Sequence, residues 1–268
     1  MNKDIVINKN KKIGKVLFIV EGQTDEIYIL RKIFTSIFDY QCQSIERAGK
    51  YRPSNLKDNP SSSVFVVNTQ ESNISDIYDE NDYLDELFTE LINNYEFPVD
   101  KAAVYYIFDR DVKSNSKQHI EDLIYKLQNS RENEEFDKAG LLLLSYPAIE
   151  SFTVSNFIDD SFDIAYELGN DVKTFLHSKN LANQRISKET LSKAVIEMTH
   201  SLETIGVSDY DLDNFGESNE KIFNYQENYY DENKVYKLLS LFCIAFIDLG
   251  LIQIEENVDT DLNKSKTS

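Results

Sequence analysis

Residues 16–34, VLFIVEGQTDEIYILRKIF, decide the fold class of this chain. Their first five residues form a continuous apolar run, which is typical of a strand buried on both faces of a parallel sheet. The run ends at Glu21. Thr24 can cap a helix whose first turn contains Asp25 and Glu26, and apolar residues then recur at helical spacing. The stretch therefore predicts a strand, a short loop and a helix.

The same alternation of strand and helix patterns continues along the first 150 residues. Short apolar runs predict strands, and segments with helical spacing predict helices between them. The strands are expected at residues 41–47, 64–68, 104–108 and 141–145, and the helices at 82–95 and 118–130. Such an order of elements predicts an α/β fold in which a mostly parallel sheet is flanked by helices.

The strand signal stops after about residue 150. Helical spacing recurs near residues 150–158, 170–182, 187–204 and 232–250, which predicts a helical C-terminal subdomain. The last of these segments is apolar nearly all round, so it is expected to be a buried helix. Residues 208–230 are acidic and rich in Asn and Tyr, and we expect them to form an exposed connection.

Length and composition fit one large domain, or a domain with an appended subdomain. The chain has 268 residues, of which 41% are hydrophobic, and this share suffices for a buried core. We expect a catalytic domain over residues 13–152 with an acidic insertion at 58–100, a helical subdomain over 153–255 and a disordered tail at 256–268. Two distant cysteines exclude a disulfide scaffold. Because apolar runs of about 18 residues are lacking, we expect a cytoplasmic protein without a membrane span.

The formal charge of −19 is distributed unevenly. Residues 1–57 contain 11 basic and 6 acidic residues, whereas residues 58–100 contain 11 acidic residues and no basic one. A basic segment on an acidic protein can mark a site for a polyanion, and solvated helix faces explain the same charges equally well. The acidity therefore argues for weak unassisted binding to nucleic acid, and so for a basic partner or a controlled effector.

Acidic side chains follow three of the predicted strands. Glu21 follows the first strand directly, Asp109 and Asp111 follow the strand of the motif VYYIFDRDV, and Glu150 comes shortly after the last strand. In α/β sheets such residues gather just past the carboxyl ends of the strands. Crowded carboxylates resist ionisation unless a cation joins them, and oxygen ligands suit Mg²⁺ or Mn²⁺. One or two such ions can activate water for attack on a phosphoryl group.

These stretches resemble a known family. VLFIVEGQTDEIYILRKIF followed by VYYIFDRDV resembles the TOPRIM domain of primases, topoisomerases, small RNA-maturation nucleases and OLD-type nucleases, which has a Rossmann-like sheet. The hallmarks are a Glu in an hhhEGxxD setting and a later DxD. The segment with Ser145, Pro147, Glu150 and Phe152 is similar to TOPRIM proteins of phage-defence systems, among them RloB-like proteins and the AriB effectors of PARIS systems. The resemblance covers roughly residues 13–152.

The resemblance implies a role for each acidic residue of the motifs. Glu21 would be the general acid or base and a metal ligand. Asp109 and Asp111 would hold Mg²⁺ or Mn²⁺, and Glu150 would be an added carboxylate near a second metal position. Thr24 would shape the loop after the first strand together with its neighbour Asp25.

Basic side chains are candidates for contacts with backbone phosphates. The family often has a Gly-Gly-Lys-like turn after its second strand, where this chain has the sequence AGK at residues 48–50. Its lysine is still available to meet a phosphate. The cationic candidates are Lys11, Lys12, Lys15, Arg47, Lys50, Arg52 and Arg110.

The resemblance implies a Mg²⁺-dependent endonuclease that hydrolyses phosphodiester bonds in RNA, with tRNA among the candidates, or in DNA. Its similarity to the phage-defence proteins implies a toxic effector that causes abortive infection. Because those proteins are often paired with an ATPase encoded nearby, we expect an ABC- or AAA-type ATPase as a partner protein. A homodimer is also considered.

Two other functions fit parts of the same pattern. An apolar strand followed by D-x-D-x-V also matches the nucleophile loop of haloacid-dehalogenase-type phosphatases, in which Asp109 would attack phosphorus and Asp111 would be the acid or base. Ser145 and the pair at residues 159–160 would then have to fill the remaining roles, and Glu21 would be unexplained. Alternatively, the chain is a non-catalytic protein whose acidic surface docks onto a basic partner.

Overall fold

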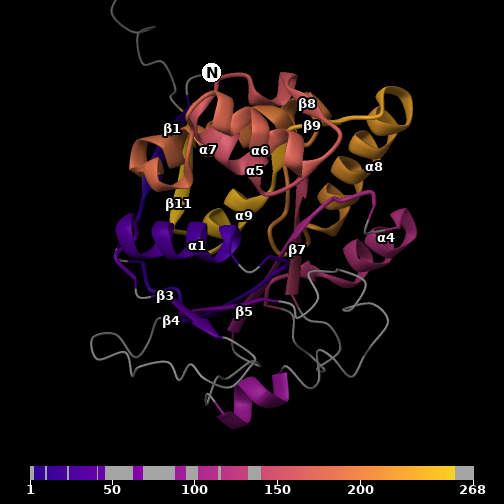
Figure 1. Ribbon diagram of the computed structural model, residues 1–268. Coiled ribbons are helices and arrows are strands. Elements are labelled where there is room, and N and C mark those ends of the chain that lie inside the picture. Colours follow the sequence, from indigo (N-terminus) through magenta and orange to yellow (C-terminus); the bar gives the residue numbers. More distant parts are fainter. Residues whose placement is uncertain are drawn as a thin grey trace, which may run out of the picture.

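The computed structural model contains a central sheet with helices packed against it (Figure 1). Its elements are numbered along the chain as in that figure. The structure describes residues 3–9, 11–22, 24–40, 42–45, 63–68, 88–94, 102–113, 116–131 and 140–256.

Within the described residues, the main sheet has seven strands. Six of them follow the spatial order β10–β7–β5–β2–β4–β3, and β6 pairs with β7 outside this path. The five strands from β7 to β3 are parallel, whereas β10 and β6 run antiparallel to β7. Their bounds are β2 (Lys15–Val20), β3 (Cys42–Ile45), β4 (Ser63–Asn68), β5 (Ala102–Asp109), β6 (Gln128–Asn129), β7 (Gly140–Tyr146) and β10 (Leu239–Ser240).

Strand β2 lies between β4 and β5 in the middle of this sheet. Val20 at its end is in register with Asn68 of β4 and Ile107 of β5, and Asp109 is in register with Ser145 of β7. All five residues from Val16 to Val20 are fully buried, as expected for a strand covered on both faces. The carboxyl ends of the three strands that carry the motifs therefore lie at one edge of the sheet.

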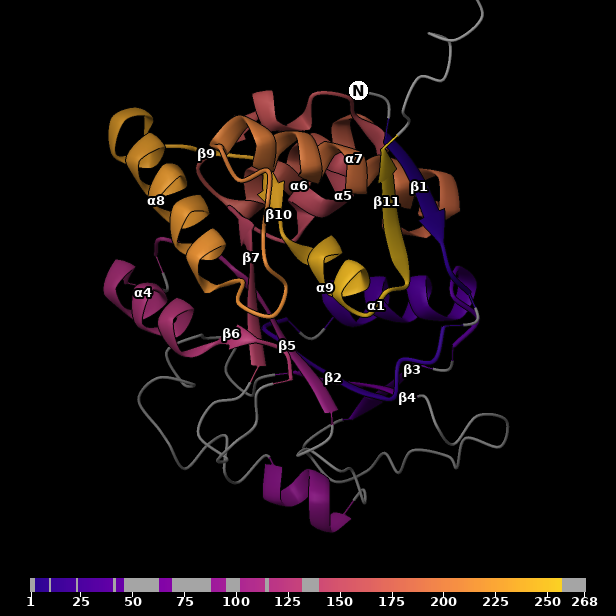
Figure 2. The same ribbon diagram turned by 180° about the vertical axis from the view of Figure 1, so that it is seen from behind.

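Helices cover the sheet on both sides. In Figure 1, α1, α5, α6, α7 and α9 lie on one side, and the helix of residues 88–94 lies on the other. Helices α4 and α8 lie side by side at one end of the molecule in both views (Figures 1 and 2). The bounds are α1 (Asp25–Ser36), α4 (Lys117–Lys126), α5 (Glu150–Phe157), α6 (Gly169–Ser178), α7 (Lys188–Ile205), α8 (Gly216–Asn233) and α9 (Phe242–Asp248).

The predicted α/β class and the mostly parallel sheet are confirmed, but the C-terminal half differs from the expectation. Strands do not stop at residue 150, because four short ones follow. The N-terminal strand β1, which the sequence did not indicate, pairs with the last of them. These strands are β1 (Lys3–Ile7), β8 (Ala165–Tyr166), β9 (Tyr236–Lys237), β10 and β11 (Ile252–Glu256), and short 3₁₀ turns lie at Ser161–Asp163 and Asn183–Arg185.

Three predicted segments are wrong in detail. Residues 232–250 are not one buried helix: they contain two short strands and then α9, and β10 adds to the edge of β7. Residues 208–230 are not an exposed connection, because most of them form α8. The helix expected at 118–130 ends at Lys126, and the next residues form β6. In each case pairing with β7 or packing on the sheet determines the local structure instead of local spacing.

The two halves of the chain share one apolar core. Buried side chains of β2, α1 and β7 belong to the same cluster as those of α7, α8 and α9. The boundary between 13–152 and 153–255 stays a prediction. Most of the acidic insertion 58–100 and the tail after Glu256 lie outside the described residues.

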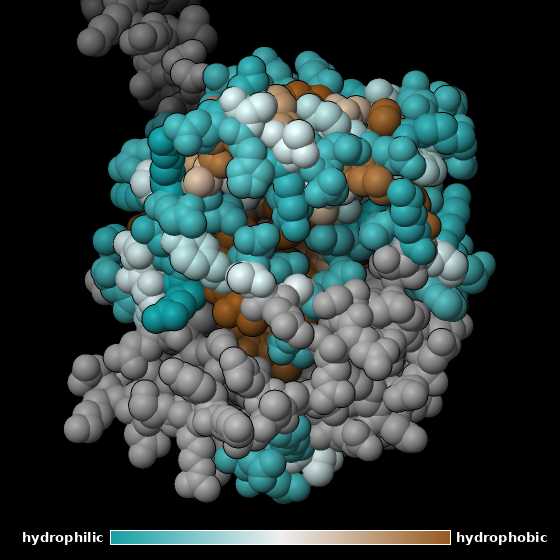
Figure 3. Space-filling view, in the orientation of Figure 1, coloured by the Kyte–Doolittle hydropathy of each residue, from teal (hydrophilic) through white to brown (hydrophobic). Residues whose placement is uncertain are grey.

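In contrast to the apolar core, the described surface is mainly polar. On the face in Figure 3, hydrophilic residues cover most of the described surface, and hydrophobic residues come into view mainly in its middle. None of the described helices combines the length and the apolar character that crossing a membrane requires.

Candidate functional site

Three predicted site residues meet at the carboxyl edge of the sheet. Glu21 follows β2 directly, Asp109 is the last residue of β5, and Glu150 is the first residue of α5, which follows β7. These strands are adjacent and parallel, so their ends bring the acidic side chains to one place. Glu21 and Glu150 are only 8% and 6% exposed, although acidic side chains are seldom so deeply buried.

Main-chain amides hold the first two carboxylates in position. The amide of Asp109 donates to Oε2 of Glu21 at 2.9 Å. Oδ1 of Asp109 in turn accepts the amide of Ile149 at 2.8 Å, just before α5 begins. The amide of Glu21 donates to the carbonyl of Ile107 at 3.3 Å and extends the ladder between β2 and β5. The ends of β2 and β5 and the start of α5 are thereby joined through Glu21 and Asp109.

The electrostatics of the site favour protonated carboxyls. Burial, with smaller contributions from Glu26 and Asp111, raises the pKa of Glu21 to about 7, although the amide of Asp109 opposes this. Burial and the nearby carboxylates of Glu21, Glu26 and Glu150 raise the pKa of Asp109 well above its ordinary value. Burial therefore disfavours the charged form of these carboxyls, and a cation bound beside them would favour it.

Glu26 is a further buried carboxylate that sequence reasoning missed. It is 6% exposed, and burial together with the charge of Asp25 raises its pKa. A Cβ atom at position 22 would lie 2.3 Å from Oε2 of Glu26, so any other residue there would displace the end of the Glu26 side chain. A signal existed in the sequence, because Glu26 shares helical spacing with Ile29 and Ile33 on the buried face of α1.

Thr24 and Asp25 lie at the start of α1. Thr24 occupies the position before the helix, but its side chain makes no capping hydrogen bond, so the predicted cap is wrong in this respect. Asp25 faces Lys173 across the site, with 3.8 Å between Oδ2 and Nζ.

Lys173 of α6 is the cation nearest to these acids among the described ion pairs. Its Nζ lies 3.2 Å from Oε1 of Glu150, and burial raises the pKa of that carboxyl although Lys173 counteracts the effect. Half of the Lys173 side chain is exposed. Nothing in the sequence pattern indicated Lys173, because it comes from the C-terminal half and reaches the site only through the packing of α6 on α5.

A pocket of about 270 Å³ opens beside the carboxylates. Its lining combines acidic side chains with two lysines, and the start of α6 comes close to Ala148 there, just before α5. A Cβ atom at position 169 would lie 2.6 Å from that of Ala148, so Gly169 permits this approach. The lining residues are Asp109, Asp111, Lys113, Pro147, Ala148, Glu150, Glu167, Leu168, Gly169, Asn170 and Lys173.

The residues of the DxD motif face different surroundings. Asp111 lines the pocket, and its Oδ1 accepts the amide of Lys113 at 2.8 Å. Arg110 differs from the expectation of a phosphate contact: it is only 2% exposed, and its guanidinium forms an ion pair with Glu227 of α8. Arg110 is therefore buried against α8 and does not line the pocket.

The remaining cationic candidates are not gathered at the pocket. Lys11 and Lys12 are exposed and Lys15 starts β2, and none of the three lines the pocket. Arg47, Lys50 and Arg52 lie outside the described residues.

The acidic residues have the chemistry of a Mg²⁺ or Mn²⁺ site, although they do not form a ready-made ligand cluster. Among the residues that the structure describes, no three Asp, Glu, His or Cys side chains are grouped so that they could hold a metal ion. Main-chain amides bind one oxygen each of Glu21, Asp109 and Asp111. Hard oxygen donors nevertheless fit a hard divalent cation, which would have to draw the carboxylates together.

The residues required by the phosphatase alternative are placed differently. The hydroxyl of Ser145 is buried and lies 2.8 Å from that of Ser240. Asp159 is exposed and pairs with Lys193 at 2.8 Å. Neither residue lines the 270 Å³ pocket.

A larger pocket, of about 560 Å³, lies between α4 and α8. It contains none of the predicted site residues, so volume alone does not identify the site. Its lining includes Glu121, Glu217 and Glu220 with the exposed Tyr125 and the buried Phe223.

Comparison with protein-family models, with curated proteins and with solved structures finds no significant match to this chain. The site is therefore defined by its own geometry: Glu21, Asp109 and Glu150 at the ends of three adjacent parallel strands, beside a pocket that Lys173 closes from the C-terminal half.

Proposed function

We propose that this chain is a Mg²⁺-dependent endonuclease of the TOPRIM type, which hydrolyses phosphodiester bonds in RNA, including tRNA, or in DNA. The observation that carries the proposal is the group of enclosed carboxylates, Glu21 and Asp109 with Glu150, beside a pocket that also contains Asp111. Burial is the main cause of the raised pKa values of these carboxyls, and a bound cation would lower them.

Each residue has a role in this proposal. Asp109, Asp111 and Glu150 would hold Mg²⁺ or Mn²⁺, and Glu21 would bind the same ion or exchange a proton with the attacking water or the leaving oxygen. The bound ion supplies charge neutralisation at the phosphoryl group. Lys173 and Lys113, which also line the pocket, would contact phosphate oxygens, since lysine binds phosphate as a point charge.

The wider role is proposed on the resemblance alone. The protein would be the toxic effector of a bacterial anti-phage system in the cytoplasm, controlled by an ABC- or AAA-type ATPase partner, with a homodimer as a further possibility for its assembly. The net charge of −19 supports dependence on such a partner, because an acidic surface repels a polyanion at long range.

Substitution of the central carboxylates tests the proposal. Glu21→Gln and Asp109→Asn keep the side-chain size and are expected to lower Mg²⁺-dependent cleavage of RNA or DNA by about a hundredfold or more. Glu197→Gln is the matched control. Glu197 is as buried as Glu21, but its carboxylate accepts a hydrogen bond from the amide of Ser161, away from the predicted site residues. Cleavage is measured by sequencing RNA and DNA fragments after incubation with Mg²⁺ or with a chelator.

The same experiment separates the alternatives. Full Mg²⁺-dependent cleavage by Glu21→Gln would show that this site is not the nuclease centre. A phosphatase would instead accumulate a phosphoryl group on Asp109 and would hydrolyse small phosphomonoesters. A protein that binds neither Mg²⁺ nor Mn²⁺ and cleaves nothing would favour the non-catalytic acidic protein.

A further inference from the structure

Arg110, the middle residue of the DxD motif, is tied to helix α8. Its Nε lies 2.8 Å from Oε1 of Glu227 and its Nη2 lies 3.0 Å from Oε2, so the guanidinium and carboxylate form a two-pronged contact. Both residues are buried, at 2% and 5% exposure. A pair of this geometry fixes direction as well as distance.

Aromatic rings and a hydroxyl surround the pair. Tyr236 of β9 donates its hydroxyl to Oε1 of Glu227 at 2.7 Å. The guanidinium carbon of Arg110 lies 5.6 Å from the ring centre of Phe223 and 5.9 Å from that of Tyr236. Both charges are therefore compensated inside the protein, and Arg110 has little freedom to move relative to α8.

Helix α8 is itself anchored to the sheet. The side-chain amide of Asn219 donates to the carbonyl of Leu142 in β7 at 2.7 Å. Gln226 donates to the carbonyl of Lys237 at 2.9 Å and accepts the amide of the same residue at 3.2 Å. These contacts hold α8, and Glu227 with it, against β7 and β9 independently of Arg110.

We propose that Glu227 is a positioning residue for the acidic site: through Arg110 it fixes the main chain between Asp109 and Asp111, and so sets where their carboxylates lie. The amide of Arg110 also donates to the carbonyl of Ser145 at 2.8 Å, so the peptide is held from its side chain and from its main chain. This inference rests on the proposed metal site.

The chemistry of buried ion pairs supports a positioning role over a purely stabilising one. A well-packed apolar pair of similar volume often replaces a buried ion pair without loss of stability, whereas removal of one partner leaves a buried charge. We therefore expect folding to tolerate the replacement of the Arg110–Glu227 pair by apolar side chains. Its distinct contribution is a fixed direction for the loop that bears the two aspartates.

The double variant Arg110→Met with Glu227→Leu tests this, because it removes both charges and leaves no unpaired one. We expect the double variant to fold with a somewhat lower unfolding temperature, because the buried Tyr236 hydroxyl loses its acceptor. We also expect hydrogen exchange to become faster at residues 109–111 than elsewhere in the sheet, and the affinity for Mn²⁺ in calorimetry to be at least tenfold weaker. The rate at saturating nucleic acid should fall while its KM changes little. Glu197→Gln, a buried carboxylate in α7 away from the motif, is the control and should change none of these values.

Each outcome decides the inference. A double variant that binds Mn²⁺ and exchanges its amides at 109–111 as the wild type does would overturn it. If the wild type itself binds no Mn²⁺ and cleaves no nucleic acid, the proposed function fails, and hydrogen exchange alone then judges the positioning role: faster exchange at 109–111 supports it and unchanged exchange rejects it. Should the double variant fail to fold, Glu227→Gln, which retains the side-chain shape, is read by the same exchange measurement.

Discussion

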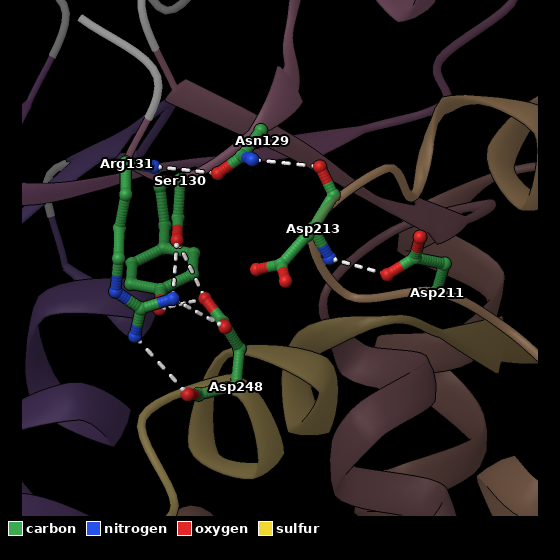
Figure 4. A network of polar contacts seen from close by, with 7 residues as sticks. Asn129, Ser130, Arg131, Asp211, Asp213 and Asp248 are labelled. Atoms are coloured by element: carbon green, nitrogen blue, oxygen red, sulfur yellow. Dashed lines mark hydrogen bonds and ion pairs between the residues drawn. The ribbon is translucent and has the colours of Figure 1, made fainter.

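Asp248 and Asp109 are both enclosed aspartates that contact the sheet, but the protein surrounds them in opposite ways. At the end of α9, Asp248 accepts hydrogen bonds from the hydroxyls of Tyr105 and Ser130 and from Nη1 of Arg131 (Figure 4). The second guanidinium nitrogen of Arg131 binds the Asp248 carbonyl at 3.1 Å. Donors and a positive charge thus compensate this carboxylate on several sides.

Asp109 has carboxylates for neighbours instead. Its Oδ1 accepts a hydrogen bond from the amide of Ile149, and burial together with the carboxylates of Glu21, Glu26 and Glu150 raises its pKa. The carboxylate of Asp248 therefore contributes to holding the fold together. The carboxylate of Asp109 is repelled by its acidic neighbours, and a bound cation would relieve this repulsion. The difference separates a carboxylate surrounded by hydrogen-bond donors from one surrounded by other carboxylates.

The largest effect on stability is expected at Asp248. Asp248→Ala leaves the buried hydroxyls of Tyr105 and Ser130 without their acceptor, and we expect a loss of about 4 kcal/mol in the free energy of unfolding. Denaturant unfolding measures this loss. Asp213→Ala is the control, since Asp213 binds Asn129 through its main-chain carbonyl and its side chain is exposed. An equal loss in both variants would show that the hydrogen bonds to the Asp248 side chain do not stabilise the fold, and would contradict the contrast between Asp248 and Asp109.

A smaller effect with the opposite sign is expected at Glu21 in the presence of a chelator. Because its pKa in the folded protein is raised to about 7, the stability that protonated Glu21 contributes is complete below its ordinary pKa and is lost as the pH rises through 7. Glu21→Gln avoids this loss. From pH 4.5 to pH 8 we expect the variant to gain up to about 3 kcal/mol relative to wild type.

Thermal unfolding at several pH values measures this gain. Glu189→Gln is a useful comparison, because the Ser187 hydroxyl lowers the pKa of Glu189 and the stability that this carboxylate contributes is lost as the pH falls. A Glu21→Gln variant whose stability follows wild type at every pH would contradict the repulsion inferred at the site.

The contrast also explains how much of the molecule the sequence could predict. Continuous apolar runs in β2, β5 and β7 revealed the parallel sheet, and the order of strand and motif placed Glu21 and Asp109 at one edge. Helix α8 escaped detection because its buried face is partly polar: Asn219 and Gln226 bind main-chain groups of the sheet, so apolar spacing is weak there. Such contacts depend on partners distant in sequence.

The missed residues of the site have the same cause. Glu26 carried a signal, since it shares the buried spacing of α1, but an acidic residue in a first turn has an ordinary explanation in the helix dipole. Lys173 carried none, because its contact with Glu150 arises only when α6 packs on α5. The sequence predicts a phosphate contact for Arg110 because it shows the charge of this residue. It does not show that the partner of Arg110 is Glu227, 117 residues later.

The smallest effect on stability is expected at Lys173, a positively charged residue beside the carboxylates of the candidate site. Lys173 is half exposed and pairs with Glu150 and Asp25 at 3.2 and 3.8 Å, so Lys173→Met should change the free energy of unfolding by less than about 1 kcal/mol. If its ammonium meets a phosphate, the variant should instead bind a non-cleavable nucleic acid more weakly. The slope of log affinity against log salt should fall by about one.

Lys179→Met is the matched control for this measurement. Lys179 follows the same helix, and its Nζ lies 5.9 Å from the ring centre of Phe175 rather than in the 270 Å³ pocket. Both variants lose one positive charge, so any difference between them reports position and not net charge. Equal salt slopes for the two would mean that Lys173 only neutralises Glu150, and would place the phosphate contacts of this acidic protein elsewhere.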